Sequence, residues 1–453
     1  MTALPGTPPD SLDEATLKQY VADELERGRN RSLGLTTRVL DEPELLAQHS
    51  RLMSPLVWDL AHVGNYEELW LLREAAGVEA MRPDLDDIYD AFEHPRATRP
   101  SLPLLRPAEA GDYLSLVRRR VLDALDRFRL PGPHEAGTGD LPGLLDAGFV
   151  FGMVLQHEHQ HDETMLATHQ LRRGEPVFPL ADAHSAPPAL VPSAEVLVPG
   201  GSFTMGTSTD VWALDNERPA HDVDLPPYLI DTVPVSNAAY RAFVEAGGYD
   251  DERLWTPAGW RWRCQSGKRS PAFWLREGGS WLRRRFGQVE PLPDAEPVQH
   301  VCWFEADAYA RWIGRRLPTE AEWEKAASWD AETRTKSRFP WGEEAPTEEH
   351  ANLGQVRHRP TPAGSFPRGA SPSGVLQMVG DVWEWTATEF TGYPGFRSYP
   401  YKEYSEVFFD DGYRVLRGGC WATDPLACRT TFRNWDHPIR RQIFAGFRTA
   451  RDA

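Results

Sequence analysis

The sequence predicts an all-helical N-terminal domain followed by an α+β domain. Its 453 residues exceed what one hydrophobic core usually supports, so more than one domain is expected. Apolar residues recur at helical spacings from about residue 11 to residue 174, whereas the later part has short alternating runs separated by glycine and proline. The 17 Trp and 39 Pro residues further indicate a large portion made of loops that aromatic side chains hold in place.

Four amphipathic segments define the N-terminal domain, which we place at residues 1–180. They read SLDEATLKQYVADELERGRN, MSPLVWDLAHVGNYEELWLLREAAG, EAGDYLSLVRRRVLDALDRF and GFVFGMVLQHEHQHDETMLATHQLRRG. Apolar residues three and four positions apart give each segment an apolar face, and four such helices suffice for an antiparallel four-helix bundle. Gly64 and Gly152 reduce helix propensity, and Pro55 fits best in a first helical turn.

A change of pattern separates the two domains. Residues 181–195 read ADAHSAPPALVPSAE, a small, Pro-rich and aperiodic stretch that is typical of a linker. For residues 196–453 we expect an α+β domain dominated by loops. Its β-like runs are EVLVPGGSFTMGT and HDVDLPPYLIDTVPV, and its predicted helices are NAAYRAFVEAG and FEADAYARWIGRRL.

The charge balance argues against large anionic partners. A formal charge of -18 repels nucleic acid and anionic membranes, so we expect neither as a partner. The basic clusters Arg118–Arg120 and Arg283–Arg285 are interpreted as solvated faces. The chain does not open with a basic segment followed by an apolar run, and no stretch approaches the ~18 apolar residues of a membrane span. We therefore expect a cytoplasmic protein, and we further expect it to be a monomer.

Histidines in the last predicted helix of the bundle indicate a metal site. His157 and His161 stand four residues apart, which on a helix places both imidazoles on one face. A third ligand is available from His62 in another predicted bundle helix. Three neutral imidazoles leave coordination positions open, which suits an iron ion that must bind substrate and dioxygen together. We interpret His159 and His169 as non-ligands, because His159 points elsewhere on the same helix and His169 lies near its end.

The same segment also matches H-E-x-x-H, the zinc metalloprotease pattern, in which Glu158 would be the general base. The extended metzincin pattern fails, because Thr164 stands where glycine is required and Ala167 where a histidine is required. A thermolysin-like third ligand would have to be a carboxylate such as Glu175, which lies in no further predicted helix. An iron oxygenase, a zinc hydrolase and a non-catalytic binding module all stay open on these residues.

The second half of the chain resembles a known domain. The strings VPGGSFTMG, RLPTEAEWE and MVGDVWEWT, with Arg417–Gly419 and Gly446–Arg448, are similar to the sulfatase-modifying-factor, or formylglycine-generating-enzyme-like, domain. This resemblance implies a C-type-lectin-like fold. Formylglycine-generating activity depends on a cysteine pair just after the Arg-Gly-Gly string. Because Cys420 and Cys428 are spaced differently, we do not expect that activity.

A DinB-like helical bundle placed ahead of such a domain resembles the hercynine oxygenases, the sulfoxide synthases of ergothioneine biosynthesis, over nearly the whole chain. The tail NWDHPIRRQ is similar to the actinobacterial type that uses γ-glutamylcysteine. The resemblance implies Fe(2+) bound by His62, His157 and His161. It also implies that O2 is used to join the substrate sulfur to C2 of the hercynine imidazole, which gives γ-glutamyl-hercynylcysteine sulfoxide. No reducing cosubstrate is expected, and no nicotinamide or flavin fingerprint is present.

The resemblance further implies residues that bind the substrates. γ-Glutamylcysteine carries two carboxylates, an ammonium group and a thiol, so its pocket needs arginines and an acid. Hercynine carries a trimethylammonium group, which favours aromatic faces. The implied residues for the first substrate are Arg96, Arg99, Asp436 and Arg440, and those for the second are Gln160, Asn434 and Trp435.

A tyrosine hydroxyl near the bound dioxygen would steer the oxidation toward carbon–sulfur bond formation. Tyr393, in the sequence TGYPGF, matches this catalytic position best, and Tyr399 and Tyr401 lie close by in the sequence. With Asp436 and Arg440, this tyrosine implies that residues of both domains contribute to the site.

Overall fold

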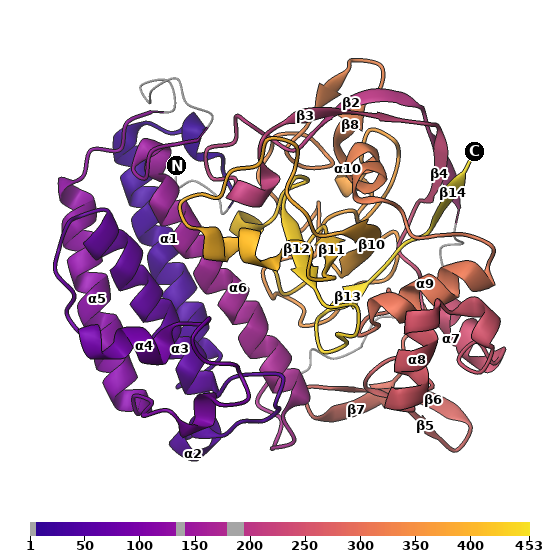
Figure 1. The fold of residues 1–453 in the computed structure, drawn as a ribbon, viewed down its shortest axis with the longest axis horizontal. Helices are drawn as coiled ribbons and strands as arrows, with labels where there is room; N and C mark the ends of the chain where they lie inside the picture. Colours follow the sequence, from indigo (N-terminus) through magenta and orange to yellow (C-terminus); the bar gives the residue numbers. More distant parts are fainter. Residues whose placement is uncertain (1–5, 133–140, 179–193) are drawn as a thin grey trace. The chain divides into compact units, whose positions relative to one another are not determined.

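The computed structural model describes residues 6–132, 141–178 and 194–453 (Figure 1). The chain forms two compact units. Unit 1 comprises Met1–Pro179 and Thr209–Trp212, and unit 2 comprises Leu180–Ser208 and Ala213–Ala453. Most of the expected linker at 181–195 lies outside the described residues, so that linker stays a prediction. The short return of Thr209–Trp212 to unit 1 is a feature that the sequence did not indicate.

Unit 1 contains four long helical segments that run beside one another (Figure 1), and all four coincide with predicted segments. They are α1 (Glu14–Gly34), α3 (Leu56–Glu67) with its π-helical continuation (Glu68–Glu74), α5 (Pro107–Arg127) and α6 (Phe149–Leu171); α2 (Glu42–Leu46) and α4 (Asp86–Tyr89) are short. Helix α1 begins after Asp13, whose side chain accepts a hydrogen bond from the amide of Thr16 at 2.8 Å. Pro55 is the N-cap of α3, one position before the first turn. None of the described helices is long and apolar enough to cross a membrane.

The two glycines in these helices lie at points of close packing. A Cβ added at Gly152 would lie 2.3 Å from the Cδ2 atom of Trp212. The indole Nε1 of Trp212 donates to the carbonyl oxygen of Ala147 at 2.9 Å, which fixes the ring against α6. A Cβ added at Gly64 would lie 3.0 Å from a Cδ atom of Leu114. Both glycines lower the helix propensity of their segments, but the missing Cβ lets a neighbouring side chain pack closely against the helix.

Buried ion pairs connect the four long helices of unit 1. Arg29 of α1 donates to Glu67 of α3 at 2.6 Å and to Glu158 of α6 at 2.8 Å. Arg118 of α5 donates to Glu67 at 2.7 Å. All four side chains are buried, so each charge needs its partner. The expectation that Arg118 lies on a solvated face is therefore wrong, because its guanidinium neutralises a buried carboxylate.

Unit 2 is an α+β domain with several small sheets and long connecting loops, as the sequence predicted. One sheet has the order β1 (Glu195–Val198), β4 (Tyr228–Asp231), β14 (Ala450–Asp452), and another has the order β12 (Arg433–Asp436), β11 (Arg414–Arg417), β10 (Trp383–Glu389), β13 (Ala445–Gly446). Smaller sheets pair β2 (Gly201–Met205) with β3 (His221–Leu225), β6 (Ser280–Arg285) with β5 (Trp274–Glu277) and β7 (Gln288–Pro291), and β8 (Trp329–Asp330) with β9 (Thr335–Lys336).

The helices of unit 2 are α7 (Asn237–Glu245), α8 (Pro257–Ser266), α9 (Trp303–Trp312) and α10 (Glu320–Ser328). Helices α7 and α9 fall in segments predicted to be helical. Helix α10 was not predicted, although Thr319 and Glu322 form a capping box that marks its start. Trp323 of α10 is fully buried and packs with Tyr228 and Met378 in a core cluster of this unit.

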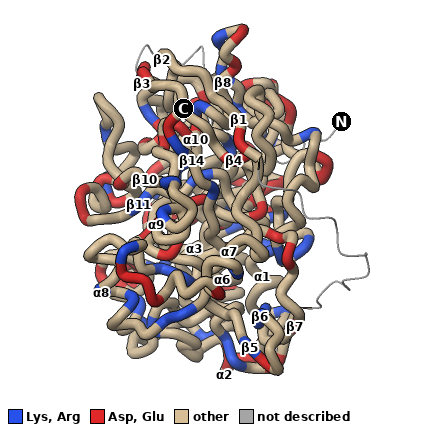
Figure 2. The backbone as a smooth tube through the Cα atoms, turned by 90° about the vertical axis from the view of Figure 1, so that its right-hand side faces the viewer, with Lys and Arg blue, Asp and Glu red and all other residues tan. Residues whose placement is uncertain are grey.

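The second basic cluster is also largely buried. Arg283 and Arg285 of β6 are 5% and 3% exposed, and their Nε atoms donate to Glu290 of β7 at 2.7 Å and 2.8 Å. Arg283 also donates to Glu296 at 2.5 Å. The expected solvated face is thus wrong for these two arginines, because β6 directs them toward acidic neighbours. Figure 2 shows that basic and acidic positions are interspersed along the backbone.

Candidate metal centre and binding residues

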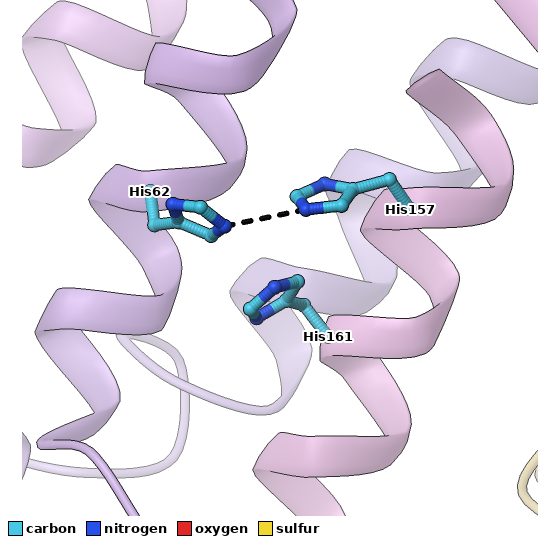
Figure 3. Close-up of side chains that lie close together, drawn as sticks. All are labelled: His62, His157 and His161. Atoms are coloured by element: carbon cyan, nitrogen blue, oxygen red, sulfur yellow. Dashed lines mark hydrogen bonds between the residues drawn. The ribbon is translucent and has the colours of Figure 1, made fainter. Parts of the chain in front are cut away.

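Three histidines from two helices of unit 1 point toward one another (Figure 3). Helix α3 provides His62, and α6 provides His157 and His161 one turn apart. The Nε2 atoms of His62 and His157 are 3.2 Å apart, and the ring centre of His161 lies 4.6 Å from that of His62 and 4.7 Å from that of His157. One ring nitrogen from each histidine lies within 4.8 Å of the other two. This spacing allows one ion to contact all three residues.

The chemistry of these imidazoles fits a metal ion. Burial lowers the pKa of His62 and of His157 well below the ordinary value of 6.5, and the nearby His161 lowers both further. Neutral rings keep a lone pair free for a metal. The Nε2 atoms of His62 and His157 face each other, and Nδ1 of His157 is buried without a hydrogen-bond partner. If both Nε2 atoms carry lone pairs, these lone pairs repel each other, and a cation bound between the two atoms would remove that repulsion.

Two hydrogen bonds orient the histidine rings. Nδ1 of His62 lies 2.7 Å from the carbonyl oxygen of Tyr89, and Nδ1 of His161 lies 3.1 Å from a carboxylate oxygen of Asp59. Both acceptors favour the tautomer with the proton on Nδ1, which leaves Nε2 to bind a metal. The ring of His157 is held differently, since it stacks on Tyr66 with ring centres 3.7 Å apart. The sequence did not identify these supporting residues.

Glu158, the candidate base of a zinc hydrolase, is occupied elsewhere. Its carboxylate accepts hydrogen bonds from Arg29 at 2.8 Å and from the hydroxyl of Ser32 at 2.9 Å. Although burial opposes its ionisation, the charges of Arg29 and Arg118 hold the pKa of Glu158 at about 2. Such a weak base is a poor proton acceptor near neutral pH.

Arg99 is a buried cation close to the histidines. Its guanidinium carbon lies 3.5 Å from the ring centre of Trp58, and the same indole stacks on His62. The guanidinium donates to the hydroxyl of Ser54 at 2.7 Å and to backbone carbonyls. No carboxylate of the described residues forms an ion pair with it, and burial lowers its pKa to about 10. Arg96, by contrast, is exposed and donates to the carbonyl oxygen of Leu52 at 3.0 Å.

Comparisons with known proteins cover nearly the whole chain. Residues 24–165 match the DinB superfamily, and residues 182–453 match the sulfatase-modifying factor enzyme 1-like domain. The chain is 52% identical to the hercynine oxygenase of Mycolicibacterium thermoresistibile, over 95% of this chain and 94% of that protein. The chain belongs to the hercynine oxygenase family. The hercynine oxygenase of Mycolicibacterium smegmatis is 48% identical over 96% of this chain and 99% of its own length.

Membership of the hercynine oxygenases settles the class of protein. The chain is an oxygenase and thus an enzyme, which excludes the non-catalytic binding module. The zinc-hydrolase alternative is not supported by the family and conflicts with the ion pairs of Glu158. The second half alone is 33% identical to the formylglycine-generating enzyme of Streptomyces coelicolor, over 61% of this chain and 95% of that enzyme. The two domain types and their order, as expected from the sequence motifs, are confirmed.

The remaining expected binding residues of this hercynine oxygenase lie in both units. Gln160 is half-buried on α6, directly before His161. Asn434 and Trp435 are half-buried on β12, and Trp435 stacks on Phe390 with ring centres 4.1 Å apart.

Asp436, the last residue of β12, forms an ion pair with Arg440 across 3.3 Å. The structure thus brings together the two residues of the tail that the resemblance grouped. Binding roles for these residues stay predictions.

Tyr393, the expected catalytic tyrosine, is buried within unit 2 at 7% exposure. Its hydroxyl donates to Glu320 at 3.4 Å, and the guanidinium carbon of Arg433 lies 4.1 Å from its ring centre. Burial raises the pKa of Tyr393 well above 10, so the phenol stays protonated at neutral pH. Tyr399 and Tyr401 are less buried. The catalytic role of Tyr393 in this hercynine oxygenase stays a prediction.

Asp59 offers a test of the metal centre. Replacing it with asparagine removes the carboxylate that fixes the tautomer of His161, so we expect affinity for a divalent ion to fall about tenfold to hundredfold. Titration with Co²⁺, followed by visible absorption, measures this change without relying on turnover. The control is Asp112→Asn, at an exposed acid on α5. Equal affinities in both variants, with equal helical content, would remove Asp59 from any role in metal binding.

Proposed function

We propose that this protein is a non-haem iron(II) oxygenase that joins the sulfur of γ-glutamylcysteine to C2 of the hercynine imidazole. The product is γ-glutamyl-hercynylcysteine sulfoxide, in ergothioneine biosynthesis. The observation that carries this proposal is the cluster of His62, His157 and His161 in a chain of the hercynine oxygenase family. The reaction balances with one O2: two electrons come from forming the carbon–sulfur bond and two from oxidising the sulfur. One oxygen atom ends on sulfur and the other in water.

The three histidines would hold the iron. Their nitrogens come from two neighbouring helices, and burial keeps the rings of His62 and His157 neutral, so both can act as ligands. Three histidine ligands are typical of ions that must keep open positions for substrates. When bound, Fe(2+) supplies a site where a thiolate and dioxygen can be activated together. The chain itself fixes ring orientation, through the carbonyl of Tyr89 and the carboxylate of Asp59.

The charged residues suit the two ends of γ-glutamylcysteine. Arg99 is a buried cation with no ion-pair partner among the described residues, so a substrate carboxylate would supply the missing countercharge. Arg96 lies three residues earlier and is exposed. Asp436 and Arg440 form an ion pair that presents both signs of charge, as the ammonium and carboxylate of an amino acid end require.

Hercynine would use aromatic and amide groups. The half-buried face of Trp435 suits a trimethylammonium group, because cations are attracted to the electron-rich face of an indole. Asn434 and Gln160 offer amide groups for the hercynine carboxylate or imidazole. We further propose that the enzyme acts in the cytoplasm as a monomer, a state that light scattering of the purified protein measures directly.

Metal content and oxygen uptake test the proposed function. The full-length protein is purified without oxygen, its iron and zinc are quantified, and oxygen uptake is followed with γ-glutamylcysteine and hercynine. We expect bound iron and one O2 consumed per sulfoxide formed, with little uptake when either substrate is omitted. Parallel reactions with cysteine and glutathione determine the preference for the thiol. Zinc in the site, together with no thiol-dependent oxygen uptake, would show the proposal to be wrong.

Tyr393→Phe tests the proposed proton donor. Because the phenol of Tyr393 stays protonated, its removal should lower sulfoxide synthesis about a hundredfold, in the usual range for losing an acid–base group. Iron binding should survive, and simple oxidation of the thiol should rise. Product ratios, measured by mass spectrometry, decide the matter. Tyr399→Phe and Tyr401→Phe are the matched controls, and an altered ratio in one of them instead would transfer the role to that tyrosine.

A further inference from the structure

The connection between β10 and β11, residues 390–413, carries most of the aromatic side chains around Trp435, and we call it the tyrosine loop. Phe390 stacks on Trp435, and the rings of Phe408 and Tyr404 lie 5.4 Å and 6.0 Å from it, centre to centre. The loop has little regular structure beyond two short 3-10 turns, Lys402–Tyr404 and Glu406–Phe408. Its own backbone pairing therefore does not explain how it holds its shape.

A single buried carboxylate contacts the loop at two points. Asp215 is 1% exposed, and one of its carboxylate oxygens accepts a hydrogen bond from the hydroxyl of Ser405. The other oxygen accepts the backbone N–H of Tyr399 at 3.3 Å. These two points lie on either side of Tyr401 and Tyr404 in the sequence. Asp215 thus holds the middle of the tyrosine loop from a position some 190 residues earlier in the sequence.

We propose that Asp215 is a positioning residue, which clamps the tyrosine loop so that its aromatic side chains are held against Trp435 for substrate binding. The inference rests on the proposed function of Trp435 in binding hercynine and extends it to a residue outside that pocket. Asp215 itself does not contact the substrate in this scheme. Its carboxylate acts through Ser405 and Tyr399 on the loop.

Burial of the Asp215 carboxyl carries a cost to folding, because its charged form is disfavoured where no water reaches it. Burial raises its pKa to about 7, with the nearby Glu217 adding a smaller rise, while the hydrogen bonds from Ser405 and Tyr399 act in the opposite direction. No described lysine or arginine forms an ion pair with Asp215. A buried carboxylate without a cation is destabilising, so a site with only a structural task would be better served by a neutral side chain. Costly buried charges are typical of positions that serve function.

Trypsin reports on the clamp without any substrate. Arg397 and Lys402 are exposed cleavage sites on either side of Tyr399. In full-length Asp215→Asn one acceptor for the loop is lost, so cleavage after these two residues should become about tenfold faster, as expected for one buried hydrogen bond. Ser405→Ala keeps the charge and should loosen the loop similarly. Asp222→Asn, at an exposed acid on β3, is the control and should match the wild type.

Stability and kinetics separate a functional clamp from simple packing. The pKa of Asp215 is above its ordinary value of 3.8, so the folded protein binds more protons than the unfolded chain between about pH 4 and pH 7. The contribution of Asp215 to stability therefore falls as pH rises through this window, and Asp215→Asn should gain in melting temperature relative to wild type as pH rises from about 5 to about 8. The KM for hercynine should meanwhile rise about tenfold, with a smaller change in kcat.

Two results would overturn the clamp. Cleavage of the tyrosine loop at wild-type rates in both Asp215→Asn and Ser405→Ala would show that Asp215 does not hold it. Faster cleavage with an unchanged KM for hercynine would reduce Asp215 to a structural residue. The proteolysis rates do not depend on the reaction, so absence of oxygen uptake by the wild type would contradict the proposed function separately.

Discussion

His157→Ala should abolish metal binding and oxygen uptake together. The substitution leaves His62 and His161 as the only members of the histidine cluster, and it removes the nitrogen that faces His62 across 3.2 Å. Losing a direct ligand should cost more than the about hundredfold upper range for losing an outer partner of a ligand. Iron content after purification without oxygen, and Co²⁺ affinity measured by visible absorption, give the result independently of turnover.

The matched control for this experiment lies on the same helix. His169 of α6 is buried and bonds through Nε2 to the carbonyl oxygen of Leu35 at 2.7 Å, outside the histidine cluster. His169→Gln keeps a donor for that carbonyl and should retain both metal and activity. Full metal content in His157→Ala would place the ion elsewhere in the protein.

Glu158→Gln should destabilise unit 1 without acting on the chemistry. The change leaves Arg29 and Arg118 with less buried negative charge, and breaking a buried ion pair usually costs about 3–5 kcal/mol. The pKa of Glu158 is lowered to about 2, so its stabilisation is present above its ordinary value of 4.5 and is lost as pH falls toward 2. Urea unfolding of the two proteins should therefore differ most near neutral pH and converge in acid.

The hydrolase alternative predicts the opposite outcome for this variant. If Glu158 were a general base, glutamine would remove turnover and leave stability nearly unchanged. We expect instead that folded Glu158→Gln retains its metal and a large part of its oxygen uptake. Glu26→Gln, at an exposed acid on α1, is the control and should change stability by no more than about 0.5 kcal/mol.

The cluster of three histidines could be predicted because its members follow local rules. His157 and His161 share a helix, so their spacing alone places them on one face, and His62 lies in a second segment with a clear helical period. Asp59 could not be found in this way. Although it lies one turn before His62, its carboxylate contacts His161 on the other helix, and that contact depends on how α3 and α6 pack.

Unit 2 was less predictable because its loops are held by distant contacts. The alternation of apolar residues identified strands such as β3 and β4, and helical periodicity identified α7. Asp215 gave no such signal, since its partners lie about 190 residues later in the chain. The prediction of solvated faces for the two basic triplets was wrong for a related reason. The sequence shows that these charges are adjacent, but it does not show that Arg118 and Arg283 each donate to a buried carboxylate of another segment.

The ion pairs of unit 1 also determine how α6 is turned about its axis. Consecutive helical residues differ by about 100° in direction, so a rotation of α6 that displaced Glu158 from Arg29 would swing His157 by the same angle. The buried charges oppose such a rotation, because it would leave Arg29 or Glu158 without its partner. We infer that replacing this network with well-packed aliphatic residues would make the bundle more stable but would leave the orientation of α6 less fixed. The three histidines would then no longer converge on one point.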